Sequence, residues 1–217
     1  MQDVTQLAGR LALPAVIAHL AAQRPVFHSE ADFQFAFGQA VAALDDRIDI
    51  RLEVPRRAEN RRTYVDLVCR DRQEVSFVEF KYVTRTWSGT DGRTEEPFEL
   101  RAHEALDLAR LHFIHDVTRL EGWTAEKSCG NAFAVLLTND NRLWEPPTTD
   151  RATRDGAFRL HEGRELGGPL AWGTPDAPFE RNDRSLRGKY VASWLPYSHL
   201  DSRPGGSFRS LGWAISG

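Results

Sequence analysis

The sequence predicts an α/β fold in which a helix, three strands, a second helix and a fourth strand follow one another. Three observations predict it. Apolar residues recur at helical spacing after Ser29 and again from about Pro97 to Glu121, where Gly122 is expected to close the second helix. Between these two segments lie three runs with the composition and length of strands. A short run at 132–137 is wholly apolar, as expected of a buried strand.

The first helix has a clear start. Ser29 is a good N-cap residue, and Asp32 follows it three positions later, in the place that a capping box gives to an acidic or amide side chain. The apolar positions of the expected helix are Phe33, Phe37, Ala40, Val41 and Leu44.

Three strands are expected next. The first covers 48–54 and should end at Pro55. The other two, 64–69 and 75–82, are joined by a loop that has neither glycine nor asparagine, so a tight two-residue turn is not expected. A symmetric four-residue loop centred between Arg72 and Gln73 joins them instead.

Charged residues interrupt this hairpin. With the loop so centred, Asp66 lies directly opposite Glu79, with Cβ atoms about 4.5–5.5 Å apart. Lys81 is two residues after Glu79 and projects from the same face. Two carboxylates at this distance repel unless a cation lies between them. Two oxygen ligands beside an ammonium group are the elements of a Mg²⁺ site with a water-activating lysine.

The predicted pairing depends on the register. A slip of one residue would move one carboxylate to the other face of the sheet. The alternative is an edge hairpin whose charges face water.

The hairpin resembles the PD-(D/E)XK nuclease superfamily, whose signature is an acidic residue on one strand and Glu-x-Lys or Asp-x-Lys on the next. Here these are Asp66 and Glu79-Phe80-Lys81, and Val65 stands where the proline of the family name would be. The resemblance covers about 26–139. It implies a restriction-endonuclease-like core, with a central mixed sheet flanked by helices. A helical segment at 1–25 would precede this core, and a β-rich extension at 140–217 would pack on it.

The resemblance also implies a chemistry. Asp66 and Glu79 would bind Mg²⁺, or Mn²⁺, with help from the carbonyl of Phe80. Lys81 would orient or deprotonate the attacking water. The expected activity is hydrolysis of phosphodiester bonds, in DNA rather than RNA by analogy, in bacterial defence or in repair.

Two further carboxylates are candidates for the same site. In the family the first helix often contributes an acidic residue, and Glu30 matches that role. Complementation of the helix dipole explains Glu30 equally well. Glu53, on the first strand, is a weaker candidate.

Arginines gather around the loop between the first two strands and suit bidentate contacts to phosphate. A solvated, arginine-rich turn is the alternative. The candidates for substrate binding are Arg56, Arg57, Arg61 and Arg62, and Arg51 belongs to the same cluster.

The segment after the hairpin, 84–96, is predicted to be a long loop that covers the substrate. Arg85 and Trp87 lie in it, and Trp87 would stack on a base. The alternative is a disordered loop with one aromatic anchor.

The following helix carries polar residues at i, i+4 and i+7, namely His103, Asp107 and Arg110. The resemblance implies that this helix packs beside the metal site, so that Asp107 and Arg110 would face the substrate or a metal-bound water. A solvated surface is expected for the other polar residues of this helix, which are His112, His115, Asp116 and Arg119.

In the C-terminal region the clearest strand candidates are 158–160, 189–195 and 208–215. Trp172, Trp194 and Trp213 are expected to pack this region onto the core.

Length and composition agree with a single domain. The chain has 217 residues and a formal net charge of −3. A protein held to nucleic acid mainly by charge would be more basic, but a net charge of −3 is compatible with phosphates that are bound through metal ions. Its two cysteines form neither a zinc pattern nor a disulfide framework. We expect a cytoplasmic protein with no membrane partner, and a homodimer would suit double-strand cleavage.

Two other functions stay open. The chain could be a catalytically silent module that binds nucleic acid or protein through the same fold. An enzyme acting on a small molecule has no cofactor fingerprint to support it.

Overall fold

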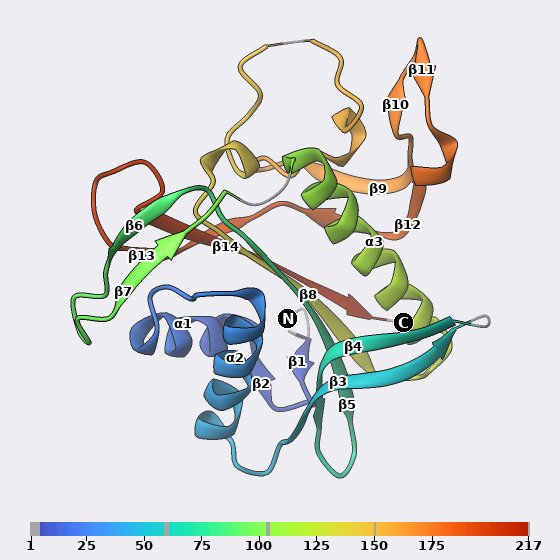
Figure 1. Cartoon of the computed structure of the whole chain (residues 1–217). Coiled ribbons are helices and arrows are strands. Elements are labelled where there is room, and N and C mark those ends of the chain that lie inside the picture. The colour runs from blue at the N-terminus through green and yellow to red at the C-terminus, as the bar shows by residue number, and fades with distance from the viewer. Residues whose placement is uncertain (1–4, 59–60, 103–104, 150, 217) are drawn as a thin grey trace.

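The computed structural model describes residues 5–58, 61–102, 105–149 and 151–216, with only the backbone described at 57, 58 and 61 (Figure 1). A six-stranded sheet lies at its centre, with the strand order β13-β14-β8-β5-β4-β3. These strands are β3 (Asp49–Ala58), β4 (Arg61–Arg70), β5 (Val75–Val83), β8 (Asn131–Thr138), β13 (Trp194–His199) and β14 (Ser207–Ser216).

The central sheet is mixed. Strands β5 and β8 pair in parallel, whereas β3–β4, β4–β5, β8–β14 and β13–β14 are antiparallel. The parallel pair requires a crossover, and helix α3 (Leu106–Ala125) lies within it. The prediction of an α/β protein with a central mixed sheet is therefore confirmed.

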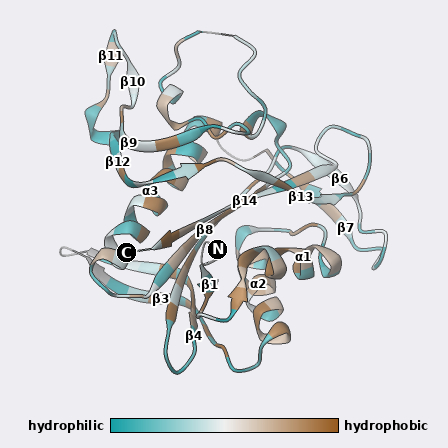
Figure 2. Ribbon diagram, turned by 180° about the vertical axis from the view of Figure 1, so that it is seen from behind, coloured by the Kyte–Doolittle hydropathy of each residue, from teal (hydrophilic) through white to brown (hydrophobic). Residues whose placement is uncertain are grey.

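Helices cover both faces of the sheet (Figure 1). Helices α1 (Leu13–Gln23) and α2 (Glu30–Leu44) pack on one face, and α3 packs on the other. Strand β8 lies between these layers: Ala132, Ala134 and Leu136 face α3, while Phe133 and Val135 face α1 and α2. All eight residues of β8 are buried, which confirms the predicted buried strand. Apolar residues concentrate along the central strands and α2 (Figure 2).

Helix α2 begins as predicted. The hydroxyl of Ser29 accepts a hydrogen bond from the backbone N–H of Asp32 at 3.2 Å. Phe33 and Phe37 are fully buried and contact the ring of Phe80 on β5, with centroid separations of 5.1 and 4.9 Å. This aromatic contact fixes α2 against the strand that carries Glu79 and Lys81.

We predict that Ser29→Ala lowers the free energy of unfolding by about 1 kcal/mol, because one N–H of the first turn loses its acceptor. Chemical denaturation measures the change. Ser29→Asp keeps an acceptor at the same position and should retain most of the wild-type stability. Equal losses in both variants would mean that the hydroxyl is not the stabilising group.

Three predicted boundaries are wrong. Pro55 does not end the first strand, because β3 is an edge strand, where a proline is tolerated. The second long helix does not begin at Pro97. Residues 97–100 form β7 (Pro97–Leu100), which pairs with β6 (Trp87–Thr90), and the helix continues past Gly122 to Ala125. The expected long loop is therefore mostly a hairpin.

Two strands of the C-terminal region belong to the central sheet. Strand β14 pairs with β8 over eight residues, and β13 extends the sheet beyond it. Strands β9 (Glu165–Leu170) and β12 (Arg184–Val191) form a separate hairpin, and β12 lies against α3. Residues expected to form a strand at 158–160 instead begin in the 3₁₀ helix η2 (Gly156–Phe158). The three tryptophans expected to pack there, Trp172, Trp194 and Trp213, are all buried in the core on the α3 side.

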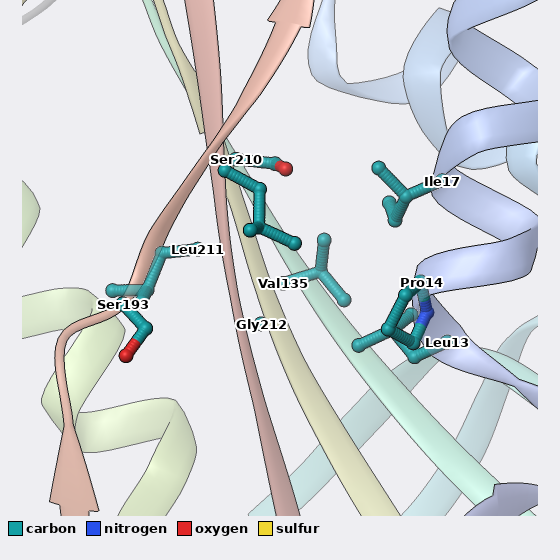
Figure 3. Close-up of a pocket in the computed structure, with 9 residues that line it drawn as sticks. Leu13, Pro14, Ile17, Val135, Ser193, Ser210, Leu211 and Gly212 are labelled. Atoms are coloured by element: carbon teal, nitrogen blue, oxygen red, sulfur yellow. The ribbon is translucent and has the colours of Figure 1, made fainter.

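At the N-terminus, β1 (Gln6–Leu7) and β2 (Leu11–Ala12) form a short hairpin before α1. A small apolar cavity of about 160 Å³ lies between α1 and the strands β8 and β14, bordered by Leu13, Ile17, Val135 and Leu211 (Figure 3). Gly212 lets α1 approach this closely, since a Cβ there would lie 2.7 Å from a methyl carbon of Leu13. No described helix is both long and apolar enough to cross a membrane.

Candidate active site

The hairpin has the predicted register. Strands β4 and β5 pair from Arg70 opposite Val75 to Leu67 opposite Val78, so the loop is centred between Arg72 and Gln73. One step further along the same register places Asp66 opposite Glu79. The regular ladder of backbone hydrogen bonds stops before this step. Beyond it, the side chain of Asp66 supplies the acceptor, because its Oδ2 accepts a hydrogen bond from the N–H of Phe80 at 2.8 Å.

A second carboxylate bonds the same strand in the same way. Oε2 of Glu30 accepts a hydrogen bond from the N–H of Tyr82 at 2.8 Å. The two backbone donors, on Phe80 and Tyr82, lie beyond the end of the β4–β5 ladder and need acceptors. The end of this ladder therefore holds Glu30 from α2 and Asp66 from β4 beside the Glu79–Lys81 segment.

Lys81 lies among carboxylates. Its Nζ is 2.9 Å from Oδ2 of Asp116 and 3.9 Å from Oε1 of Glu30, and it donates to the carbonyl of Phe80 at 2.9 Å. Burial lowers the pKa of Lys81, but the carboxylates of Asp116 and Glu30 outweigh burial and raise the pKa above that of a free lysine. The side chain is therefore an ammonium ion in this arrangement and cannot accept a proton.

Glu79 is the most deeply buried acid of the group, with 2% of its surface exposed. Its Oε2 lies 2.6 Å from Nη2 of Arg119, and its Oε1 is buried without a hydrogen-bond donor among the described residues. Burial raises the pKa of Glu79, and the carboxylates of Asp66 and Asp116 raise it further against the opposing charges of Arg119 and Lys81.

Asp66 shares this environment. Burial raises its pKa, and the hydrogen bond from the Phe80 N–H and the charge of Lys81 oppose the rise. Two carboxyl groups this close need a proton or a cation between them. The carboxyl pair of Asp66 and Glu79 can therefore bind a proton or a metal cation.

Two residues of the site were not predicted. Asp116 and Arg119 were expected on a solvated surface, yet Asp116 is 7% exposed and its Oδ1 lies 3.0 Å from Nη2 of Arg119. The position of Asp116 in the sequence could have predicted its burial. It lies three residues after Phe113 and four before Leu120, on the apolar stripe of the helix. A charge within such a stripe is buried and needs a partner.

The weaker acidic candidates differ from each other. Burial raises the pKa of Glu30, and the charge of Lys81 opposes it. Glu53 faces Asp66 in the β3–β4 register, but its φ of 51° interrupts that pair and its side chain is exposed. Glu30 therefore belongs to the carboxylate cluster, and Glu53 lies at its margin.

The predicted substrate-binding arginines are only partly described. Arg56 lies over the ring of Phe77 at 4.6 Å and donates to the carbonyl of Ser128 at 3.0 Å. Arg62 is exposed and lies over Tyr64. The side chains of Arg57 and Arg61 lie outside the described residues.

The candidates in the β6–β7 segment hold the fold together. Trp87 is 4% exposed, and its indole N–H donates to Asp201 at 3.1 Å, so its ring is not available to stack on a base. Arg85 donates to the side chain of Asn141 at 3.2 Å. The alternative interpretation of Trp87 as a structural anchor agrees with this geometry.

The candidates on the first turns of α3 point away from the carboxylates. Arg110 is 3% exposed and pairs with Asp155 at 2.6 Å, and Asp107 pairs with Arg154. His103, expected to share their face, lies outside the described residues. Both pairs tie α3 to the C-terminal region, because the face that meets the sheet is the one with Asp116 and Arg119 rather than the one with Asp107 and Arg110.

A divalent cation suits the donor set, although no group of three or more His, Cys, Asp and Glu side chains in the described part of the chain has the arrangement of a preformed metal site. Asp66 and Glu79 supply carboxylate oxygens, which Mg²⁺ and Mn²⁺ prefer, and Glu79 Oε1 is buried without a donor. Lys81 and Arg119 are the cations that neutralise the cluster here.

The chain matches no protein-family model, no curated protein and no solved structure.

Proposed function

We propose that the chain is a Mg²⁺-dependent nuclease of the restriction-endonuclease-like type that hydrolyses phosphodiester bonds, with DNA as the favoured substrate. One observation carries the proposal. The close carboxyl pair Asp66 and Glu79 lies on adjacent strands at the point where their ladder ends, and Lys81 follows on the same strand. This is the relation that the PD-(D/E)XK signature requires.

The order of elements supports the same proposal. Helix α2, strands β3, β4 and β5, helix α3 and strand β8 follow the αβββαβ order, with the β6–β7 hairpin inserted after β5. The carboxylate of Glu30 reaches the site from α2, in the role that the resemblance gives to the first helix.

The residues of the chain have separate tasks in the proposed mechanism. Asp66, Glu79 and the Phe80 carbonyl would hold Mg²⁺ or Mn²⁺, which when bound polarises the phosphate and lowers the pKa of water. The ammonium group of Lys81 orients the attacking water and stabilises negative charge on the phosphate. Asp116 positions that ammonium group through its 2.9 Å contact. Because Lys81 is held in its charged form, we assign it no role as a base.

A specific observation also favours a second function. Arg119 and Lys81 already pair with Glu79 and Asp116, so two of the four carboxyl groups have a counter-ion without a metal. Carboxylates that are paired with cations of the chain itself are expected of a catalytically silent module that binds nucleic acid or protein. Such a module would bind DNA equally well with a chelator present and would not cleave it.

Asp66→Asn tests the two functions against each other. The variant keeps an acceptor for the Phe80 N–H but loses the charge, so Mn²⁺ binding should weaken by about tenfold or more, and cleavage of plasmid and linear DNA should fall with it. Calorimetry measures the binding and gel electrophoresis the cleavage.

Asp49→Asn is the matched control, since Asp49 is exposed on β3 and pairs with Arg51. It should behave as wild type. Mn²⁺ binding that is the same in both variants, or cleavage that survives Asp66→Asn, would refute the proposed metal site.

A further inference from the structure

A pocket with three arginines lies in the C-terminal region, apart from the carboxylate cluster. It has an accessible volume of about 370 Å³ and is bordered by the segment before η2 and by the hairpin of β10 (Gly173–Thr174) and β11 (Ala177–Pro178), which Figure 1 shows projecting beyond β9 and β12. The polar side chains that line it belong to Thr149, Arg151, Thr153, Arg159, Arg164 and Thr174.

The charged side chains that line this pocket are all positive. None of the described residues that line it is acidic, and three of them are arginines. The nearby carboxylate of Asp155 is already shared between two guanidinium groups, with Arg110 at 2.6 Å and Arg159 at 3.4 Å. Asp155 therefore leaves positive charge uncompensated around the pocket.

Arg164 has no ion-pair partner among the described residues. One of its terminal nitrogens donates to the carbonyl of Gly156 at 3.0 Å, but its Nε is buried and has no acceptor among the described residues. Burial lowers the pKa of Arg164, and the charge of Arg159 lowers it further. The same guanidinium groups add to the effect of burial in lowering the pKa of His161. A guanidinium group held among like charges is stabilised by an anion.

The wall of the pocket is shaped by backbone that tolerates little change. Gly173 has a φ of 114°, and a Cβ at this position would lie 2.5 Å from the carbonyl oxygen of Ala177. The tight β10–β11 hairpin brings Thr174 to the pocket. Hydroxyl and guanidinium groups that line one concave surface can donate to several oxygens of one oxyanion.

We propose that this pocket binds a phosphate group, carried either by a small phosphorylated molecule or by a nucleic-acid strand. A carboxylate ligand would use one arginine in a planar, bidentate contact, whereas a tetrahedral oxyanion can receive donors from several directions, as Arg151, Arg159 and Arg164 offer. The pocket shares no lining residue with the carboxylate cluster, so the inference does not depend on the proposed nuclease activity.

The experiment is a calorimetric titration of the full chain with inorganic phosphate, in a buffer that contains a chelator and no other phosphate or sulfate. We expect saturable binding that Arg164→Gln weakens by about tenfold or more, because a charge-assisted contact is lost. Arg151→Gln, at an exposed position, is a second variant that should weaken binding without a risk to folding. Arg181→Gln removes an exposed arginine of the same region outside the pocket and should bind as wild type.

Competition identifies the source of the phosphate. Displacement by adenosine monophosphate, with tighter binding than phosphate itself, would assign the pocket to a small phosphorylated molecule. Displacement by a short DNA duplex and not by the mononucleotide would assign it to a nucleic-acid strand. The proposal is overturned if phosphate shows no saturable binding, or if Arg151→Gln binds phosphate as tightly as wild type and the control Arg181→Gln do. Mn²⁺ binding and its loss in Asp66→Asn are unaffected by either result, so the two proposals fail separately.

Discussion

Replacing Lys81 by methionine is expected to lower the rate of DNA cleavage by about 10³-fold without weakening Mn²⁺ binding. Methionine keeps the length and apolar stem of lysine but removes the ammonium group that lies 2.9 Å from Asp116. The loss falls on the chemical step, because Lys81 supplies a charge near the reacting water and no ligand to a metal.

The affinity for Mn²⁺ distinguishes this role from a structural one. Lys81 repels a cation bound at Asp66 and Glu79, so Lys81→Met should bind Mn²⁺ as tightly as wild type or more tightly. Single-turnover cleavage and calorimetry on the same preparations measure the two quantities. A variant that binds less Mn²⁺ would show instead that Lys81 organises the carboxylates.

Lys189→Met is the control for the change in charge. The Lys189 side chain is 82% exposed and pairs with Glu165 at 3.8 Å, far along the chain from the site. Its replacement should leave cleavage unchanged. If Lys81→Met cleaves DNA as fast as this control does, the proposed role of Lys81 is wrong.

The part of the site that the sequence predicted depends on local pairing. A hairpin joins neighbouring segments, so the centre of the loop fixes which residues oppose each other, and the pairing of Leu67 with Val78 agrees with the predicted centre. The cap at Ser29 and the buried strand β8 are also local patterns, and both were found as predicted.

The part that was missed depends on contacts between distant segments. The face that α3 turns toward the sheet is set by packing, and the helical spacing of Asp107 and Arg110 does not distinguish a face toward the site from one toward the C-terminal region. Asp116 and Arg119 are 35 or more residues from Lys81 in sequence, with the β6–β7 hairpin between. The pairing of β14 with β8 is likewise non-local. The sequence predicted a strand at 208–215, but it did not predict which strand of the sheet would be its partner.

Arg119→Met is expected to destabilise the metal-free protein by about 3 kcal/mol at pH 10, since removing one partner of a buried ion pair leaves the other charge uncompensated. The partner is Glu79, whose Oε2 lies 2.6 Å from the guanidinium group and which is 2% exposed. Burial raises the pKa of Glu79 to about 9 in the wild type, and without Arg119 the pKa rises further. Below pH 9 both folded proteins hold the Glu79 proton, so the loss should be smaller at pH 7 and should grow as the pH rises through 9, where the wild type releases the proton and the variant keeps it.

The double variant Glu79→Gln, Arg119→Met removes both charges and should lose less stability at pH 10 than Arg119→Met alone, which a double-mutant cycle by chemical denaturation measures. A divalent cation replaces the missing guanidinium group if Asp66 and Glu79 are its ligands. Mn²⁺ should therefore stabilise Arg119→Met more than it stabilises wild type, and it should not stabilise the double variant. Equal stabilisation of all three proteins would place the metal elsewhere and would leave Arg119 as the permanent counter-ion of Glu79, which is the arrangement expected of the catalytically silent module.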